Sequence, residues 1–157
     1  MSKVNTLSLE SNRQIKINFD GGDLSSDAGL LLIKEFVSKI GIDRLFSRSF
    51  KTNDSASFRY HTDKDNLLQM IYMIIAGYFE DDASDELTND PVFKAVLNKE
   101  ALASKPTISR FHNRLDEDSL NQFLSISRIL RKEIYSIQVP ESVILDLDST
   151  LLDAYGK

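Results

Sequence analysis

The spacing of apolar residues divides the chain into a short alternating segment, a long stretch of helical periodicity and a final apolar run. In residues 14–19, polar and apolar side chains alternate and place Ile15, Ile17 and Phe19 on one side, which is typical of a strand. Beyond the Asp20-Gly21-Gly22 turn, apolar residues recur every three or four positions as far as Ile137. The chain is therefore predicted to be mainly α-helical, with a short N-terminal strand.

Capping residues and helix breakers give the predicted helices their bounds. Aspartate followed by proline at Asp90-Pro91 is a strong start signal, and Gly41 and Pro140 are stop signals. The predicted helices run from Ser25 or Ser26 to about Ile40, from Ile42 to Phe46, from Asp63 or Asp65 to about Tyr78, from Pro91 onward, from Thr107 to Arg114, and from Asp116 or Asp118 to about Ile137.

The final apolar run, Val143 to Leu147, predicts a strand that is buried on both faces. Side chains alternate along a strand, so Asp146 and Asp148 share one face. Ionised carboxylates are rarely buried without partners, and a hard cation such as Mg²⁺ is a suitable partner. The alternative is that both aspartates cap or turn the end of the strand, together with Ser149 and Thr150.

Composition excludes several classes of protein. Apolar residues make up 41% of the 157 and charged residues 27%, which is typical of a soluble folded protein. No cysteine is present and there are two histidines, so disulfides and thiolate or histidine-rich zinc sites are not expected. The N-terminus has no signal-peptide core, and the apolar stretch 67–79 is too short to cross a membrane. A cytoplasmic location without membrane contact is expected.

The net charge of −5 hides two segments of opposite sign. Residues 80–90 are acidic without a base, and a solvated loop is favoured over a cation site there. Residues 105–114 are basic without an acid, and with the preceding helix they resemble a helix-turn-helix unit. The candidate DNA-binding residues on this second helix are Lys105, Thr107, Ser109, Arg110, Asn113 and Arg114. A solvated face beside the apolar stripe Ile108, Phe111 and Leu115 is an equally good interpretation, and Arg44, Arg48 and Lys51 form a second basic group with the same ambiguity.

Four blocks, in order along the chain, resemble bacterial insertion-sequence transposases of the DDE superfamily. They are the segment from Phe19 to Leu32 (FDGGDLSSDAGLLL), the segments AGYFEDD (76–82) and DELTNDPVFK (85–94), the segment KPTISRF (105–111), and the segment LDLDST (145–150). The resemblance implies a helical region that recognises transposon ends, followed by a ribonuclease-H-like α/β catalytic domain. Residues 1–140 would form the recognition region and residues 141–157 the first strand of the catalytic domain.

The same resemblance implies phosphodiester hydrolysis and strand transfer with paired Mg²⁺ ions. Asp148 matches the family's first catalytic aspartate and metal ligand, and Asp146 is the alternative. The expected partner is double-stranded DNA carrying the terminal inverted repeats, with a second copy or the full-length transposase as further partners. The family also needs a second aspartate and a glutamate from later strands, and Asp153 is too close to Asp148 to serve. The chain is therefore expected to be an N-terminal portion that is inactive by itself, or a repressor-like protein that occupies transposon ends.

A second resemblance concerns only the final apolar run. The string from Ile144 to Leu152 (ILDLDSTLL) is similar to the first motif of haloacid-dehalogenase-like phosphatases, where Asp146 would be the nucleophile and Asp148 the general acid. That fold normally begins with this motif, and it needs a later lysine and an acidic pair. The position of the motif after residue 142 therefore favours the transposase interpretation, and turnover of a phosphate ester abolished by Asp146→Asn would favour the phosphatase.

Overall fold

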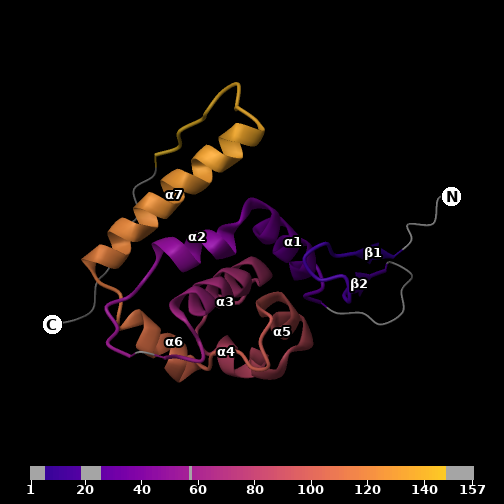
Figure 1. The fold of residues 1–157 in the computed structure, drawn as a ribbon, viewed down its shortest axis with the longest axis vertical. Helices are drawn as coiled ribbons and strands as arrows, with labels where there is room; N and C mark the ends of the chain where they lie inside the picture. Colours follow the sequence, from indigo (N-terminus) through magenta and orange to yellow (C-terminus); the bar gives the residue numbers. More distant parts are fainter. Residues whose placement is uncertain (1–5, 19–25, 57, 148–157) are drawn as a thin grey trace.

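The computed structural model describes residues 6–18, 26–56 and 58–147, and it is mainly helical (Figure 1). The N-terminal strands are β1 (Leu7–Ser8) and β2 (Lys16–Ile17). The helices are α1 (Leu30–Ile40), α2 (Ile42–Ser49), α3 (Asp63–Ala76), α4 (Ala83–Glu86), the 3₁₀ helix η1 (Leu87–Asn89), α5 (Pro91–Leu97), α6 (Lys105–His112) and α7 (Glu117–Ile137).

Local chemistry explains where the helices begin and end. Thr62 and Asp116 each form a capping box with the backbone N–H three residues later, and Asp90 accepts the backbone N–H of Phe93. Gly41 and Gly77 end α1 and α3 in the left-handed conformation, with φ of 71° and 91°. A side chain would strain the backbone at both positions.

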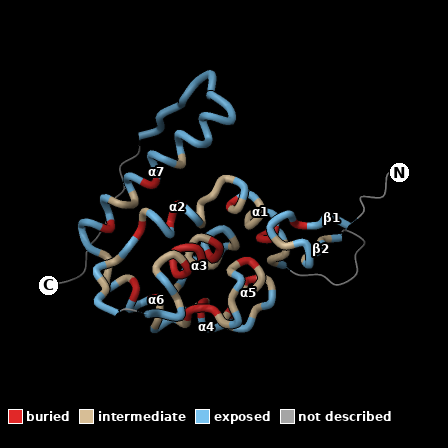
Figure 2. The backbone as a smooth tube through the Cα atoms, in the orientation of Figure 1, coloured by how far each residue is buried: buried red, intermediate tan, exposed pale blue. Residues whose placement is uncertain are grey.

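Helix α3 lies at the centre of the helical body, and α1, α2, α5 and α6 all pack against it (Figure 1). Most of its N-terminal half is buried, as the red part of the tube in Figure 2 shows. The largest fully buried apolar side chains are Leu9, Tyr72, Phe93, Ile108 and Phe111. Leu9 belongs to the N-terminal segment, and the other four come from three helices, α3, α5 and α6. This core holds α6 firmly against α3.

Helix α7 is the exception, because its main contact is with α2 and its far end extends away from the body (Figure 1). Ile126 is buried, and the Phe123 ring lies 4.7 Å from that of Phe50. All residues from Arg131 to Pro140 are exposed (Figure 2). Apolar side chains on the uncovered part are Leu120, Leu124, Ile129, Ile134, Tyr135 and Ile137.

The N-terminal strands form an antiparallel pair in which Leu7 lies opposite Ile17. Leu9 is buried just after β1, and the Glu35 carboxylate of α1 accepts the backbone N–H groups of Glu10 and Ser11 at 3.2 and 3.0 Å. The Ser11 hydroxyl also donates to this carboxylate, at 2.7 Å, and it is the main cause of the lowered pKa of Glu35, followed by the Ser11 backbone N–H. The hairpin is thereby attached to α1.

The prediction of a mainly helical chain with a short N-terminal strand is confirmed. The strand is shorter than predicted, and Phe19 lies outside the described residues. The loop predicted for residues 80–90 is wrong, because α4 and η1 form there and bury Ser84 and Leu87. The solvated acidic character is confirmed for Asp82, Asp85 and Glu86, which are exposed. No described helix is both long enough and apolar enough to cross a membrane.

The buried strand predicted at Val143–Leu147 is also not found. These residues have no assigned secondary structure, and Ile144 and Leu147 are 92% and 95% exposed. A strand needs a neighbour for its backbone hydrogen bonds, and the described residues provide none here. The apolar residues 143–147 are thus suited to a strand, but the described residues contain no sheet with which they pair.

Candidate nucleic-acid interface

Helix α6 presents two different faces. Ile108 and Phe111 are buried against the body, whereas Ser109, Arg110 and Asn113 are exposed. These three polar residues lie within one helical turn of each other, so they share one side of the helix. The side chains of one small surface can therefore reach a ligand together.

The compact helix-turn-helix pair predicted from α5 and α6 is not formed. The main partners of α5 are α1 and α3, whereas those of α6 are α3 and α4. The connection between them is held on α3 instead, because the Gln69 carboxamide accepts the backbone N–H of Ala103 and donates to its carbonyl, both at 2.8 Å. Leu102 and Ala103 are buried at this point.

The acidic segment holds the N-terminal end of α6. Lys105 pairs with Asp82, and its backbone N–H donates to Asp85 at 2.9 Å. The hydrogen bond and charge of Asp82 raise the pKa of Lys105. His112 Nδ1 lies 3.5 Å from the Asp81 carboxylate. Much of the negative charge that the sequence places beside α6 is thus used to fix the helix.

Arg114, which the sequence places among the candidate DNA-binding residues, points into the protein rather than away from it. Its side chain is 15% exposed, and it lies 3.1 Å from Asp63 and 3.5 Å from Asp54. It also donates to the Thr52 hydroxyl at 3.1 Å. Arg114 therefore joins α6 to the start of α3 and to the loop before it.

The loop before α3 is fixed by a second arginine. Arg59 pairs with Asp54, and its Nη2 donates to Asp54 Oδ1 at 2.8 Å. The hydrogen bond from Arg59 holds the pKa of Asp54 far below its usual range. Lys99 donates to the Tyr60 carbonyl at 2.8 Å, and its ammonium lies 4.8 Å from the centre of the Tyr60 ring.

This loop, α3 and α6 line a cavity of about 210 Å³ that is open to solvent, which we call the α6 cavity. Its lining combines basic, aromatic and amide side chains: Phe58, Arg59, Tyr60, His61, Asn66, Thr107, Arg110 and Arg114. Among the residues predicted to bind DNA, Thr107, Arg110 and Arg114 come together here, with Arg110 donating to the Thr107 hydroxyl at 3.2 Å. The contribution of residues 58–61 was not predicted, although their alternation of aromatic and basic residues was an available signal.

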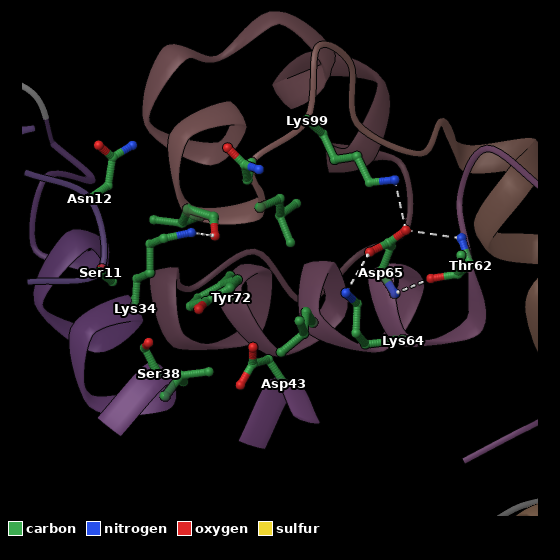
Figure 3. Close-up of a pocket in the computed structure, with 15 residues that line it drawn as sticks. Ser11, Asn12, Lys34, Ser38, Asp43, Thr62, Lys64, Asp65, Tyr72 and Lys99 are labelled. Atoms are coloured by element: carbon green, nitrogen blue, oxygen red, sulfur yellow. Dashed lines mark hydrogen bonds and ion pairs between the residues drawn. The ribbon is translucent and has the colours of Figure 1, made fainter. Parts of the chain in front are cut away.

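A larger cavity of about 610 Å³ lies between α1, α2, α3 and residues 96–99. Lys99 and Lys64 converge there on Asp65 at 2.8 and 3.6 Å (Figure 3). Burial alone would raise the pKa of Asp65, but hydrogen bonds from Lys99 and Thr62 outweigh it and lower the pKa. Burial also raises the pKa of Tyr72 to about 12 and lowers that of Lys34.

The charges of this larger cavity are mostly paired with one another. Lys34 donates to the Val96 carbonyl, and Lys99 to Asp65 (Figure 3). Asp43 is the exception, since its Oδ1 is buried without a partner among the described residues. Because most of its charged side chains are bound to other groups of the protein, this larger cavity is a polar junction between helices rather than a surface for an extended ligand.

The predicted catalytic carboxylates are not assembled in the described part of the chain. Asp146 is exposed in the irregular segment after α7, and Asp148 lies outside the described residues. Across residues 6–18, 26–56 and 58–147, no three histidine, aspartate or glutamate side chains are grouped as a metal site would require. These residues do not fit a paired Mg²⁺ centre, and we derive no catalytic step through one.

Comparison with known proteins identifies the family. No curated protein and no solved structure matches the chain. The family model described as transposase DDE domain group 1 matches residues 7–157, which is nearly the whole chain. The order of sequence blocks and the family match agree, and the chain belongs to the DDE domain group 1 family of transposases.

Proposed function

We propose that the helical region, residues 1–140, recognises transposon ends by binding their double-stranded terminal inverted repeats through the exposed face of α6. The observation that carries this proposal is the division of α6 into a face sealed by Ile108 and Phe111 and a face exposing Ser109, Arg110 and Asn113. Membership of the transposase family supports DNA as the ligand.

The exposed residues have distinct roles in this proposal. Arg110 and Asn113 have the side chains that pair with base edges in the major groove. Ser109 and Thr107 contact phosphates, which fixes the register of the helix on the duplex. Lys105 is already paired with Asp82, so its contribution to phosphate binding is small. Arg114 acts indirectly, by holding α6 on α3.

We assign residues 141–157 to the start of the catalytic domain, with Asp148 as the first catalytic aspartate and Mg²⁺ ligand and Asp146 as the alternative. In the family, Mg²⁺ supports phosphodiester hydrolysis and strand transfer. The exposure of Ile144 and Leu147 supports this assignment, because apolar side chains of this kind suit the interior of a sheet.

A gel-shift titration tests the DNA proposal. The probes are a duplex of the element's terminal inverted repeat and a duplex of the same composition in scrambled order. We expect tighter binding to the repeat, and Arg110→Ala should weaken it by about 5- to 150-fold, the range for one bidentate base contact of about 1–3 kcal/mol. The matched control is Arg128→Ala, which removes an exposed arginine from α7.

Two results would contradict the proposal. One is equal affinity for the repeat and the scrambled duplex at physiological salt, since non-specific binding depends on phosphate charge alone. The other is an equal loss of affinity in Arg110→Ala and Arg128→Ala. Either result would show that α6 is not the helix that recognises the repeat sequence.

A further inference from the structure

Asn66 is a buried amide without a partner. It lies in the first half of α3, lines the α6 cavity and is 1% exposed. Neither its Nδ2 nor its Oδ1 has a hydrogen-bond partner among the described residues. Buried polar groups are nearly always paired, and an unpaired one is costly, so an orphaned carboxamide that lines a cavity indicates a ligand.

The side-chain amide of Gln69, in contrast, has both of its hydrogen-bonding groups paired. Gln69, one turn further along α3, is also 1% exposed, and it donates to and accepts from the backbone of Ala103 at 2.8 Å each. The same kind of group is thus fully bonded where the protein supplies both a donor and an acceptor. At Asn66 the described residues supply neither group, which leaves both amide atoms for a ligand.

That complement has to offer an acceptor and a donor side by side. Adenine presents this pair at N7 and N6, and asparagine is the side chain that matches it. The cavity volume of about 210 Å³ is below the roughly 300–1,000 Å³ of sites for drug-sized ligands, so it suits a single base. Such a base must be unpaired and unstacked to enter.

The other walls suit a base joined to a sugar-phosphate chain. Tyr60 and Phe58 are 50% and 82% exposed, and aromatic rings at a cavity mouth are the usual stacking partners of unpaired bases. Lys99 holds Tyr60 in place through its carbonyl and ring. Arg110, exposed at the rim, can reach a flanking phosphate.

We propose that the α6 cavity binds one unpaired adenine base of a DNA strand, with the Asn66 amide pairing with N6 and N7. Tyr60 or Phe58 stacks on the base, and Arg110 contacts the adjacent phosphate. The inference rests on the proposed function, since it places DNA at α6. The base comes either from a single strand or from a duplex that releases one adenine.

Fluorescence anisotropy of the full chain with labelled oligonucleotides tests this. The strands are thymine oligomers of about 15 nucleotides, long enough for typical single-strand sites. Each carries at its centre an adenine, a 7-deazaadenine, which lacks the N7 acceptor, or a thymine. A further pair of duplexes separates the two sources: one is fully matched, and the other has one adenine opposite an abasic position.

We expect adenine to bind about 5- to 150-fold more tightly than 7-deazaadenine or thymine, as for one bidentate amide–base pair. Asn66→Leu, which keeps the volume and removes both amide atoms, should lower the affinity for the adenine strand to that for the thymine strand. If the preference for adenine is seen only with the single-stranded oligonucleotides, the bound base comes from single-stranded DNA. A preference for the abasic duplex over the matched one assigns it to an extruded adenine.

Equal binding of adenine and 7-deazaadenine by the wild-type chain would overturn the inference, and so would an Asn66→Leu variant that keeps the preference. The 7-deazaadenine comparison uses unmodified protein, so it decides the matter even where a variant folds poorly. Ser109→Ala separates the two proposals, because it should weaken matched-duplex binding and leave the adenine preference unchanged. Loss of sequence-specific duplex binding with the adenine preference intact refutes the proposed function alone.

Discussion

Replacing Arg114 with methionine separates a structural arginine from a DNA-contacting one on the same helix. The substitution keeps most of the side-chain stem but leaves the carboxylates of Asp63 and Asp54 without their shared cation. Breaking a fully buried ion pair costs about 3–5 kcal/mol. Asp63 is 18% exposed and keeps two hydrogen bonds from Thr52, so we expect a loss of about 2 kcal/mol in the free energy of unfolding.

Urea denaturation of the full chain, followed by far-UV circular dichroism, measures this loss. With a slope of about 1–3 kcal/mol per molar urea, the midpoint should fall by roughly 1 M. The matched control is Arg110→Met, which replaces an exposed arginine four residues earlier, and its free energy of unfolding should stay within about 0.5 kcal/mol of the wild type. An Arg114 variant as stable as the Arg110 variant would refute the structural role that we assign to Arg114.

Two further predictions concern the region where the loop joins α3. Burial, followed by the charge of Lys99, lowers the pKa of His61 in the folded protein. Below the ordinary histidine pKa of about 6.5, the unfolded chain therefore binds more protons at His61 than the folded chain does. Stability is lost as the pH falls through that value. His61→Gln should reduce the difference in urea midpoint between about pH 7.5 and about pH 5.5, and an unchanged difference would show that other groups cause it. Thr62→Ala removes the side chain that accepts the Asp65 N–H at the start of α3 and should cost about 1 kcal/mol. Ser127→Ala, in the exposed part of α7, is the control, and an equal effect in both would refute the capping role.

The helices were predictable because their signals are local. Asp90-Pro91, Gly41 and the capping position at Asp116 act within one turn of the chain, and the periodicity between them defines a buried face. The N-cap of α3 is Thr62, one residue before the predicted start at Asp63. The structure of the acidic segment, residues 80–90, was not predicted, because the groups that it binds are distant in sequence. Asp82 and Asp85 meet Lys105 only after α4 and α6 have packed together.

The candidate site was only partly predictable for the same reason. The basic character of α6 can be read from Arg110 and Arg114, but the inward position of Arg114 depends on Asp63, which lies 51 residues away in sequence. The orphaned amide of Asn66 has no sequence signal, since asparagine in a helix is usually solvated. For Asp146 and Asp148, the assignment as catalytic residues stays a prediction.

The narrow attachment of α7 has a mechanical consequence. A helix of 21 residues is about 31 Å long, so a tilt of 10° at its base displaces its far end by about 5 Å. Chemistry on a phosphodiester tolerates errors of about 1 Å in the placement of reacting groups. Under the catalytic role proposed for Asp148, the angle of this lever has to be fixed by further contacts before that aspartate can act on bound DNA.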